Sequence, residues 1–321
     1  MPESSRHHAE YSEKELPLVS IVTVNYQQTL LTELMLRSLQ RISYPSVEIF
    51  VVDNGSGDQS IQQILSEFPE VKLIMSPRNL GFAGGNNLAF PHCRGSYILL
   101  LNNDTEVDPG FLEPLVESLE KNPTIGIVSP KIFFFDEPDR LQFAGASQMH
   151  PITLRGRKFG FRERDKACYN QEQEIGFPNG ACMMFRRSIL SEIGYLYEPF
   201  FLYYEEHDWV ERARRTGHRI LFQPASRIWH KVSASTGAES PLKAHYLHRN
   251  RLVFIRRNRT GIIGVLARGY FWLIATPRTL WKYRSHREHR QSVWQSILWH
   301  ARHPVRLPEQ PPVQPISPIA I

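Results

Sequence analysis

Short runs of apolar residues alternate with amphipathic segments along the first third of the chain. Runs at 19–24, 47–52, 71–75 and 97–101 are rich in Val, Ile and Leu, and each ends at a polar or glycine-bearing cluster. Such runs predict strands that are buried on both faces. Between them, apolar residues recur at helical spacing. The alternation predicts an α/β fold, with a mostly parallel, Rossmann-like sheet and helices on both faces.

The second third of the chain follows this pattern less regularly. We expect further strands at 125–130, 132–135, 177–185, 219–222 and 228–230. Between 136 and 174 neither the helical nor the strand period holds, and basic residues crowd together. Two interpretations are open for this segment: a mobile basic loop over the site, or a solvated irregular insertion.

Past Pro241 the composition becomes basic and aromatic. The chain has 38 Lys and Arg against 32 Asp and Glu, a net charge of +6, and many of the basic residues follow this point. The apolar run at 262–274 is interrupted and too short to span a membrane. Three interpretations of this run remain open: a helix in an anionic membrane interface, a helix packed on the core, or a nucleic-acid contact.

These shifts in composition divide the chain into four segments. We expect a disordered lead-in over 1–16, an α/β domain over 17–240, a basic helical extension over 241–303, and a disordered proline-rich tail over 304–321. The polar start predicts no signal peptide. The chain has 3 cysteines without CxxC spacing, which argues against a disulfide framework or a zinc site and fits the cytoplasm.

The strand at 97–101 ends abruptly in Asn102-Asn103-Asp104. A carboxylate at the carboxyl end of a buried strand lies where open α/β sheets bind their ligands. Asp104 is a hard oxygen donor, suited to a magnesium- or manganese-type ion that also contacts phosphates. The alternative is a loop aspartate that caps the helix expected after Gly110.

Two other strand ends carry glycine-rich polar turns. One is the segment 53–58, DNGSGD, where Asp53 can accept hydrogen bonds from a ribose or a base; its spacing is not the dinucleotide fingerprint. The other is 78–87, RNLGFAGGNN, whose glycines predict a close approach to another group. Arg78 could reach a phosphate there, and N–H groups at a helix start could face an anion. Plain connecting loops are the alternative for both.

Three carboxylates, Glu205, Glu206 and Asp208, follow an aromatic run at a predicted helix start. The helix dipole favours negative charge there, which is a structural explanation. The catalytic explanation is that one of them is a general base, desolvated by the aromatics and with its proton affinity raised by a neighbouring carboxylate. His230, at the end of a strand, is either structural or a metal ligand beside Asp104.

Together these motifs resemble family 2 glycosyltransferases, in particular the bacterial rhamnosyltransferase-like branch. The resemblance covers roughly residues 18–257 and implies a GT-A fold over 17–240, a nucleotide-sugar donor and an inverting transfer. The matching stretches, in the family's order, are VSIVTVNY (19–26), EIFVVDNGSGD (48–58), RNLGFAGGNN (78–87), LLLNNDT (99–105), PFFLYYEEHD (199–208), IWH (228–230) and HRNR (248–251).

The resemblance also implies roles for particular residues. Asp104 matches the last carboxylate of a DXD-type motif, so it would hold a divalent ion, Mg²⁺ or Mn²⁺, together with His230. Glu206 matches the catalytic base, where the family usually has Asp; Glu205 and Asp208 are the alternatives. The donor-binding positions would be Asn25, Asp53, Asn54, Arg78, Asn79, Gly81, Asn86, Asn103 and Asp104.

The expected function is therefore an inverting transfer of a sugar, with rhamnose from dTDP-rhamnose favoured, to a cell-surface glycan or a polyprenyl-linked acceptor. A divalent ion would stabilise the leaving diphosphate while a carboxylate takes the acceptor proton. The expected location is the cytoplasm, with peripheral attachment to the inner face of the cell membrane left open. The alternative is a non-catalytic module that binds a nucleotide sugar or glycan. A nucleic-acid-binding protein is a third class, which the α/β half does not support.

Overall fold

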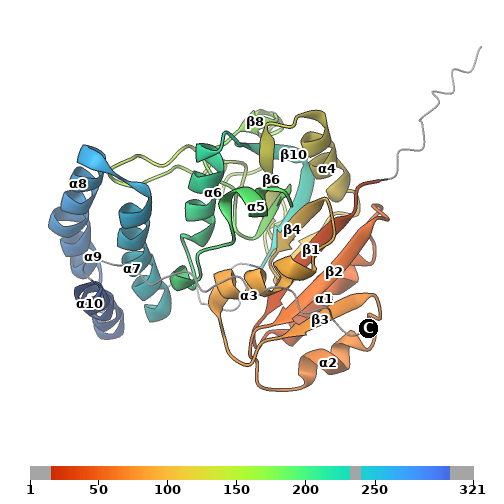
Figure 1. Ribbon diagram of the computed structural model, residues 1–321, viewed down its shortest axis with the longest axis horizontal. Helices are drawn as coiled ribbons and strands as arrows, with labels where there is room; N and C mark the ends of the chain where they lie inside the picture. The colour runs from red at the N-terminus through yellow and green to blue at the C-terminus, as the bar shows by residue number, and fades with distance from the viewer. Residues whose placement is uncertain (1–15, 232–239, 304–321) are drawn as a thin grey trace, which may run out of the picture.

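The computed structural model describes residues 16–231 and 240–303. Its strands form one sheet in the order β3-β2-β1-β4-β9-β6-β10-β5, with β7 paired to β6 and β8 paired to β10 (Figure 1). Nearly all of the lead-in expected over 1–16, and all of the tail expected over 304–321, lie outside the described residues.

The first half of the sheet is parallel, as the alternation of apolar runs predicts. β1 lies between β2 and β4, so the chain crosses to the other side of β1 on its way from β3 to β4. The carboxyl ends of these strands therefore meet at one edge. The elements are β1 (Val19–Asn25), α1 (Thr29–Leu39), β2 (Val47–Asp53), α2 (Ser60–Leu65), β3 (Val71–Met75), α3 (Gly81–Ala89), η1 (Phe90–His92) and β4 (Tyr97–Leu101).

The second half of the sheet is mixed, because β9 runs antiparallel to both β4 and β6, and β5 runs antiparallel to β10. Two pairs of expected strands are single long strands here, and an irregularity between Gln223 and Arg227 lets β10 continue through the polar stretch. The elements are β5 (Thr105–Val107), α4 (Leu112–Lys121), β6 (Ile125–Phe134), β7 (Leu141–Phe143), η2 (Ala167–Tyr169), β8 (Gln173–Glu174), β9 (Cys182–Arg186) and β10 (Arg219–His230).

Helices complete the molecule, and those after residue 240 form a group at one end, beside α6. α7 joins them to the rest, because its Leu252, Phe254 and Ile255 are buried in a cluster that includes Phe200. The elements are α5 (Ile189–Ile193), η3 (Glu198–Phe200), α6 (Glu205–Arg215), α7 (Pro241–Asn258), α8 (Gly261–Tyr270), the π-helical turn η4 (Phe271–Ala275), α9 (Thr276–Lys282) and α10 (Arg287–Arg302).

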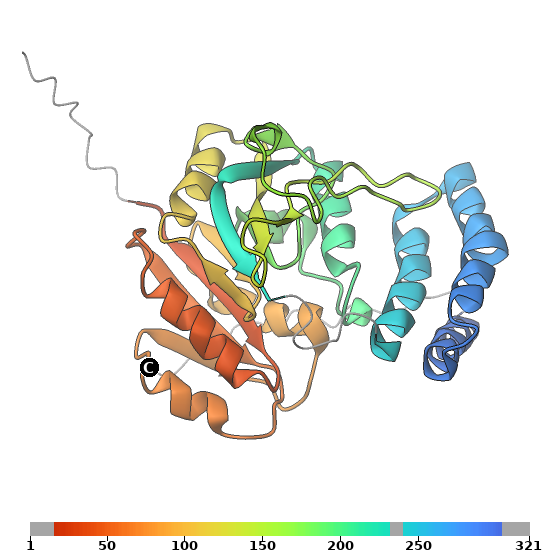
Figure 2. The ribbon, with the colours of Figure 1, turned by 180° about the vertical axis from the view of Figure 1, so that it is seen from behind.

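The irregular segment expected between 136 and 174 contains a long loop that reaches these helices (Figure 2). The side chains of Arg251 and Arg259 donate hydrogen bonds to the carbonyls of Thr153 and Pro151. Leu154, at the tip, is buried in the same cluster as Phe200 and Leu252. The basic loop is therefore tied down at its tip, which argues against the mobile loop, one of the two interpretations that the sequence left open.

Candidate active site

Asn25 and Asp53 end neighbouring strands and are partners in the sheet register. The Asn25 Nδ2 donates to Asp53 Oδ1 at 2.9 Å, and the Ser56 hydroxyl donates to the same oxygen at 2.5 Å. Asp53 is fully buried. Its carboxylate thus braces the turn that follows β2, with Ser56 lying over it. Asn103 is also part of this group, because its Nδ2 donates to Thr32 Oγ1, which in turn donates to Asn25.

Asn54 and Asn79 shape the next turn. The Asn54 Oδ1 accepts the Leu80 N–H at 3.0 Å, and the Asn79 Oδ1 accepts the Gly81 N–H at 2.8 Å. The Arg78 side chain is exposed at the rim of this turn. These residues lie together at the strand ends, as the motifs predict, but the asparagine side chains are used by the protein's own backbone.

The start of α3 contacts the turn that precedes the carboxylates. The Phe82 N–H donates to the Phe201 carbonyl at 2.7 Å, so this member of the helix-start N–H groups expected to face an anion is used by the protein's own backbone. Gly81 has φ +70°, and a Cβ there would lie 2.2 Å from the Phe201 oxygen; the expected close approach of this glycine-rich segment is confirmed. Asn86 is buried and donates to the Phe82 carbonyl.

Asp104 and His230, which lie far apart in the sequence, are side by side. β10 pairs with β5 so that His230 is opposite Thr105, and the His230 Nε2 lies 3.0 Å from the Asp104 Oδ1. Gln142 lies behind His230, with Oε1 2.9 Å from its Nδ1. Gln142 is a residue that sequence reasoning did not find, because no local motif marks it.

This pair fits one side of a divalent metal site. The Asp104 Oδ1 is buried and has no hydrogen-bond partner in 16–231 or 240–303, although the imidazole nitrogen is close. If Nδ1–H donates to Gln142, then Nε2 turns a lone pair toward the carboxylate, which a shared cation would stabilise. The described residues contain no group of three or more metal-ligating side chains, and Mg²⁺ commonly takes only one or two carboxylates plus substrate phosphates.

The carboxylates Glu205 and Glu206 follow a turn with unusual backbone geometry. Phe201, Tyr203 and Tyr204 all have positive φ, at +64°, +68° and +75°, a conformation that costs about 1–3 kcal/mol for each non-glycine residue. Side chains of α7 hold this turn in place. Its polar contacts include Arg249 Nη2 to the carbonyls of Pro199 and Phe200, and Asn250 Nδ2 to the carbonyls of Phe200, Leu202 and Tyr203.

Glu205 and Glu206 have opposite protonation behaviour. Burial, together with the charge of Glu206, raises the pKa of Glu205 well above its usual range. Burial also acts to raise the pKa of Glu206, but the neighbouring His207, a backbone N–H and the charge of Lys158 together outweigh it, so the pKa of Glu206 falls below its usual value. At neutral pH Glu206 is the ionised partner, with His207 Nδ1 3.0 Å from its Oε1. The raised proton affinity expected for the base is found at Glu205 instead.

A short turn at 179–181 connects Glu206 with the strand end that carries Asp104. A Cβ on Gly180 would lie 3.9 Å from the Glu206 Oε1, and the Asn102 N–H donates to the Ala181 carbonyl at 2.9 Å. Sequence reasoning placed this segment inside the strand expected at 177–185, whereas β9 begins at Cys182, and so its place in the site was missed. Its signal is the glycine, because a larger side chain would narrow the space beside Glu206.

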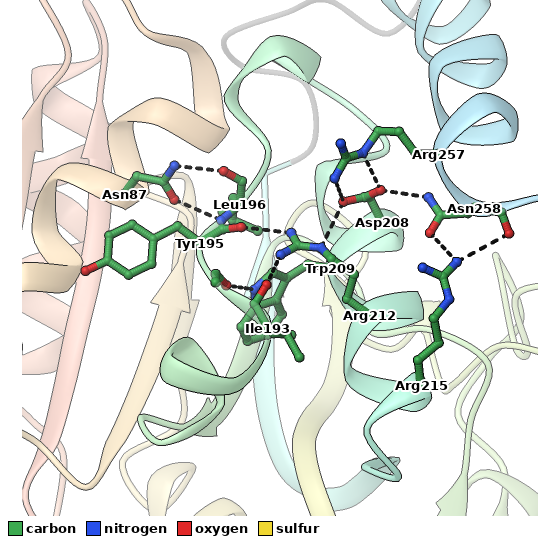
Figure 3. A network of polar contacts seen from close by, with 11 residues as sticks. Asn87, Ile193, Tyr195, Leu196, Asp208, Trp209, Arg212, Arg215, Arg257 and Asn258 are labelled. Atoms are coloured by element: carbon green, nitrogen blue, oxygen red, sulfur yellow. Dashed lines mark hydrogen bonds and ion pairs between the residues drawn. The ribbon is translucent and has the colours of Figure 1, made fainter. Parts of the chain in front are cut away.

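Asp208 lies in a different environment from the two glutamates. It is fully buried and accepts hydrogen bonds from Arg212, Arg257 and Asn258 (Figure 3). Arg212 also donates to the carbonyls of Ile193 and Tyr195. Both oxygens of Asp208 are therefore engaged in joining α6 to α7 and to the segment after α5.

A family model decides the class of this protein. The model of "Glycosyl transferase family 2" matches residues 19–194, which is more than half of the chain and includes β1 to β9. The chain belongs to glycosyl transferase family 2. It is thus a glycosyltransferase, as the motifs predict. The residues described at the ends of β1, β2 and β4 fall inside the matched segment, whereas Glu205, Glu206 and His230 lie beyond it.

Curated relatives of this family 2 glycosyltransferase have named activities. N-acetylglucosaminyl-diphospho-decaprenol L-rhamnosyltransferase of Mycobacterium tuberculosis is 26% identical over 269 residues, which is 76% of this chain and 86% of that protein. Low-salt glycan biosynthesis hexosyltransferase Agl10 of Haloferax volcanii is 28% identical over 243 residues, 73% of this chain and 74% of that protein.

Solved structures confirm the GT-A fold predicted for this family 2 member. Mannosyltransferase PcManGT from Pyrobaculum calidifontis, in complex with GDP-Man and Mn²⁺, has a TM-score of 0.54 and 15% identity, and the match covers 91% of this chain and 77% of that one. GalNAc-T7 with UDP, GalNAc and Mn²⁺ has a TM-score of 0.59 and 16% identity, and covers 84% of this chain and 58% of that one.

Proposed function

We propose that this glycosyltransferase transfers rhamnose, with inversion, from a nucleotide-diphosphate donor such as dTDP-rhamnose to N-acetylglucosamine carried on a prenyl diphosphate. The observation that supports this choice of substrates is the match to the mycobacterial rhamnosyltransferase, which extends over 86% of that protein's length. The geometry supports the mechanism: the turn at 179–181 lies beside the ionised Glu206, and it also bonds Asn102, two residues before the Asp104 of the buried Asp–His pair.

In the proposed reaction, Glu206 accepts the proton of the acceptor hydroxyl. The hydroxyl oxygen forms a bond to C1 of the sugar as the bond from C1 to the diphosphate oxygen breaks, and the nucleoside diphosphate leaves with the electron pair. A single in-line displacement of this kind inverts the anomeric carbon and needs one base. Glu206 can take this role because it is ionised at neutral pH and therefore has a free carboxylate oxygen to accept the proton.

Asp104 and His230 would hold the divalent ion, which would stabilise the charge on the leaving diphosphate. The structures of PcManGT and GalNAc-T7 that share this fold contain Mn²⁺. The donor would lie over the ends of β1, β2 and β4, where Asn25, Asp53, Asn54, Asn79 and Asn103 form the turns. In this proposal those side chains mainly shape the donor site through their bonds to neighbouring backbone and side chains.

The experiment is a transfer assay with separated components. Purified protein with Mn²⁺ or Mg²⁺ is incubated with dTDP-rhamnose, UDP-N-acetylglucosamine or GDP-mannose, and with a short-chain prenyl-diphosphate N-acetylglucosamine, and products are identified by mass spectrometry. The proposal predicts a product one deoxyhexose heavier from dTDP-rhamnose, and its loss with EDTA. Binding of nucleotide sugars without product or nucleotide release would favour the non-catalytic module.

We also propose that the helices over 241–303 are an extension of a catalytic domain over 17–240 and place it on an anionic bilayer. Large apolar side chains are exposed there, including Leu273 at 79%, Ile262 at 70% and Trp281 at 66%, among arginines that suit anionic lipid. No helix in the described ranges is long and apolar enough to cross a membrane. Attachment to the inner face of the cell membrane would then be peripheral.

Vesicle sedimentation tests this attachment. We expect binding to vesicles containing phosphatidylglycerol, weaker binding to phosphatidylcholine alone, and a loss of several-fold in Leu273→Glu. Leu30→Glu is the matched control, because Leu30 on α1 is also 65% exposed but lies outside the extension. Equal effects of both substitutions would contradict a membrane face on the extension.

A further inference from the structure

A cavity of about 440 Å³ lies between the long loop, α7 and α9. Its walls carry five cationic side chains and no acidic one. We call it the arginine pocket, and its cationic members are Arg155, Arg251, Arg278, Lys282 and Arg284. A concave surface lined by charges of one sign concentrates counter-ions, so the arginine pocket is suited to an anion.

The arginines of this pocket are not neutralised by neighbouring carboxylates. Within 16–231 and 240–303, no salt bridge involves Arg155, Arg251, Arg278 or Arg284. Among these described residues the Arg251 Nε is also buried without a hydrogen-bond partner. A buried donor without an acceptor is unfavourable, so the protein itself does not fully satisfy the Arg251 guanidinium.

The arginine pocket and the turn before the candidate base are linked through α7. Arg251 follows Asn250, whose side chain holds the turn before Glu205, and Arg251 is near enough to Tyr204 for its charge to oppose the rise in the tyrosine's pKa that burial causes. The same helix, α7, therefore contributes to the arginine pocket and to the turn that carries Glu205 and Glu206.

The other side of the pocket borders exposed apolar surface. Ala275 and Trp281 line the cavity. The residues just before Ala275, Leu273 and Ile274, are 79% and 52% exposed, and Trp281 is itself 66% exposed. A ligand with an anionic group and an apolar chain could therefore place the anionic group in the arginine pocket and the chain on the exposed apolar surface beside it.

We propose that the arginine pocket binds the diphosphate of the prenyl-diphosphate-linked acceptor. Guanidinium groups bind phosphate oxygens through paired hydrogen bonds. The prenyl chain would leave over η4 and α9, and the sugar would extend along α7 toward Glu206. The identity of the acceptor rests on the proposed function; the binding of a prenyl diphosphate does not depend on whether rhamnose is transferred.

The test measures binding and transfer separately. Farnesyl diphosphate is titrated by calorimetry into the full chain, with thymidine diphosphate in excess to occupy the donor site. Arg278→Gln/Arg284→Gln is compared with Arg287→Gln/Arg302→Gln, a control of equal charge change whose residues are exposed on α10 and lie outside the pocket. The pocket residues changed are not part of the proposed catalytic machinery.

We expect the pocket variant to bind farnesyl diphosphate at least tenfold more weakly, and to show a matching rise in KM for the acceptor with the donor KM unchanged. The control should behave like the unmodified protein.

Equal weakening in both variants would overturn the proposal in favour of diffuse charge. Inorganic pyrophosphate that binds as tightly as farnesyl diphosphate would also overturn it, by pointing to a free anion. A pocket variant that loses binding to phosphatidylglycerol vesicles but still binds farnesyl diphosphate normally would overturn the proposal in favour of a lipid-binding surface. If farnesyl diphosphate binds as expected but no sugar is transferred, the proposed function fails and the pocket assignment stands.

Discussion

The side-chain amide of Asn250 donates a hydrogen bond to the backbone carbonyl of Tyr203 over 2.8 Å. The same nitrogen lies 2.9 Å and 2.7 Å from the carbonyls of Phe200 and Leu202. The two N–H groups of one asparagine on α7 are therefore shared among three carbonyls of the positive-φ turn that carries Glu205 and Glu206. This gives the HRNR motif a physical role: it positions the candidate base.

The first prediction concerns this contact. Asn250→Ala should lower kcat by about 10²-fold, because a displacement of about 1 Å at a reacting group has an effect of that size, while KM for the donor changes little. Asn122→Ala, at the end of α4, is the control. Steady-state kinetics with both substrates varied make the measurement, and an unchanged kcat in a folded Asn250→Ala protein would remove the positioning role.

Substitution of Asp208 tests whether this residue has a structural role, joining α6 to α7, or acts as the catalytic base. Removing its charge leaves Arg212 and Arg257 without their buried partner, so Asp208→Asn should lower the free energy of unfolding by about 3–5 kcal/mol. Urea denaturation measures this, with Glu117→Gln as a control at an exposed pair on α4. A variant as stable as the unmodified protein, but inactive, would identify Asp208 as a catalytic group.

Glu205 should make stability depend on pH in a defined direction. Its pKa is raised in the folded protein, so the proton that it holds favours folding fully below the unfolded-state pKa of about 4.3, and this contribution is lost as pH rises through the folded pKa. Glu205→Gln should therefore be increasingly more stable than the unmodified protein from pH 4 to pH 8, by about 1.4 kcal/mol for each unit of raised pKa. A difference in unfolding free energy that does not change with pH would contradict the buried, neutral state.

His248 should make stability depend on pH in the opposite direction to Glu205. Burial, with smaller effects from the nearby His300, Arg251 and His245, lowers its pKa to about 3, and it bonds Ser296 and Thr276 across the C-terminal helices. Its contribution to stability is present above about pH 6.5 and is lost as pH falls toward 3, by at most about 1.4 kcal/mol per pH unit. Urea denaturation should show that the free energy of unfolding falls less steeply from pH 7.5 to pH 4.5 in His248→Gln than in the unmodified protein. His286→Gln should show the same pH dependence as the unmodified protein.

Much of the fold could be predicted from the sequence because its strands are short and apolar. The runs that became β1 to β4 needed only their composition and their polar ends. The course of β9 between β4 and β6 could not be predicted, because antiparallel insertion depends on long-range pairing that no local pattern encodes. The same limit applies to β6 and β10, whose polar interruptions look like strand ends.

Site residues could be predicted from the sequence where a local motif marks each of them. Asp104 and His230 were expected as partners, and they are adjacent. Gln142 and Gly180 were not expected, because each acts through a neighbour brought close by the fold. The protonation of Glu205 and Glu206 depends on which carboxylate faces His207 and Lys158, and adjacent residues of one sequence motif cannot reveal that difference.

The most direct test of the account is the effect of Glu206→Gln on kcat for rhamnose transfer, compared with Glu205→Gln in the same assay. The substitution removes the ionised base and keeps its shape, so kcat should fall by about 10²–10⁴-fold, with donor binding retained. Glu205→Gln should keep most of its activity, because the carboxyl that it replaces is already neutral. A Glu206→Gln enzyme with near-normal kcat, or a larger loss in Glu205→Gln, would contradict the assignment of Glu206 as the base.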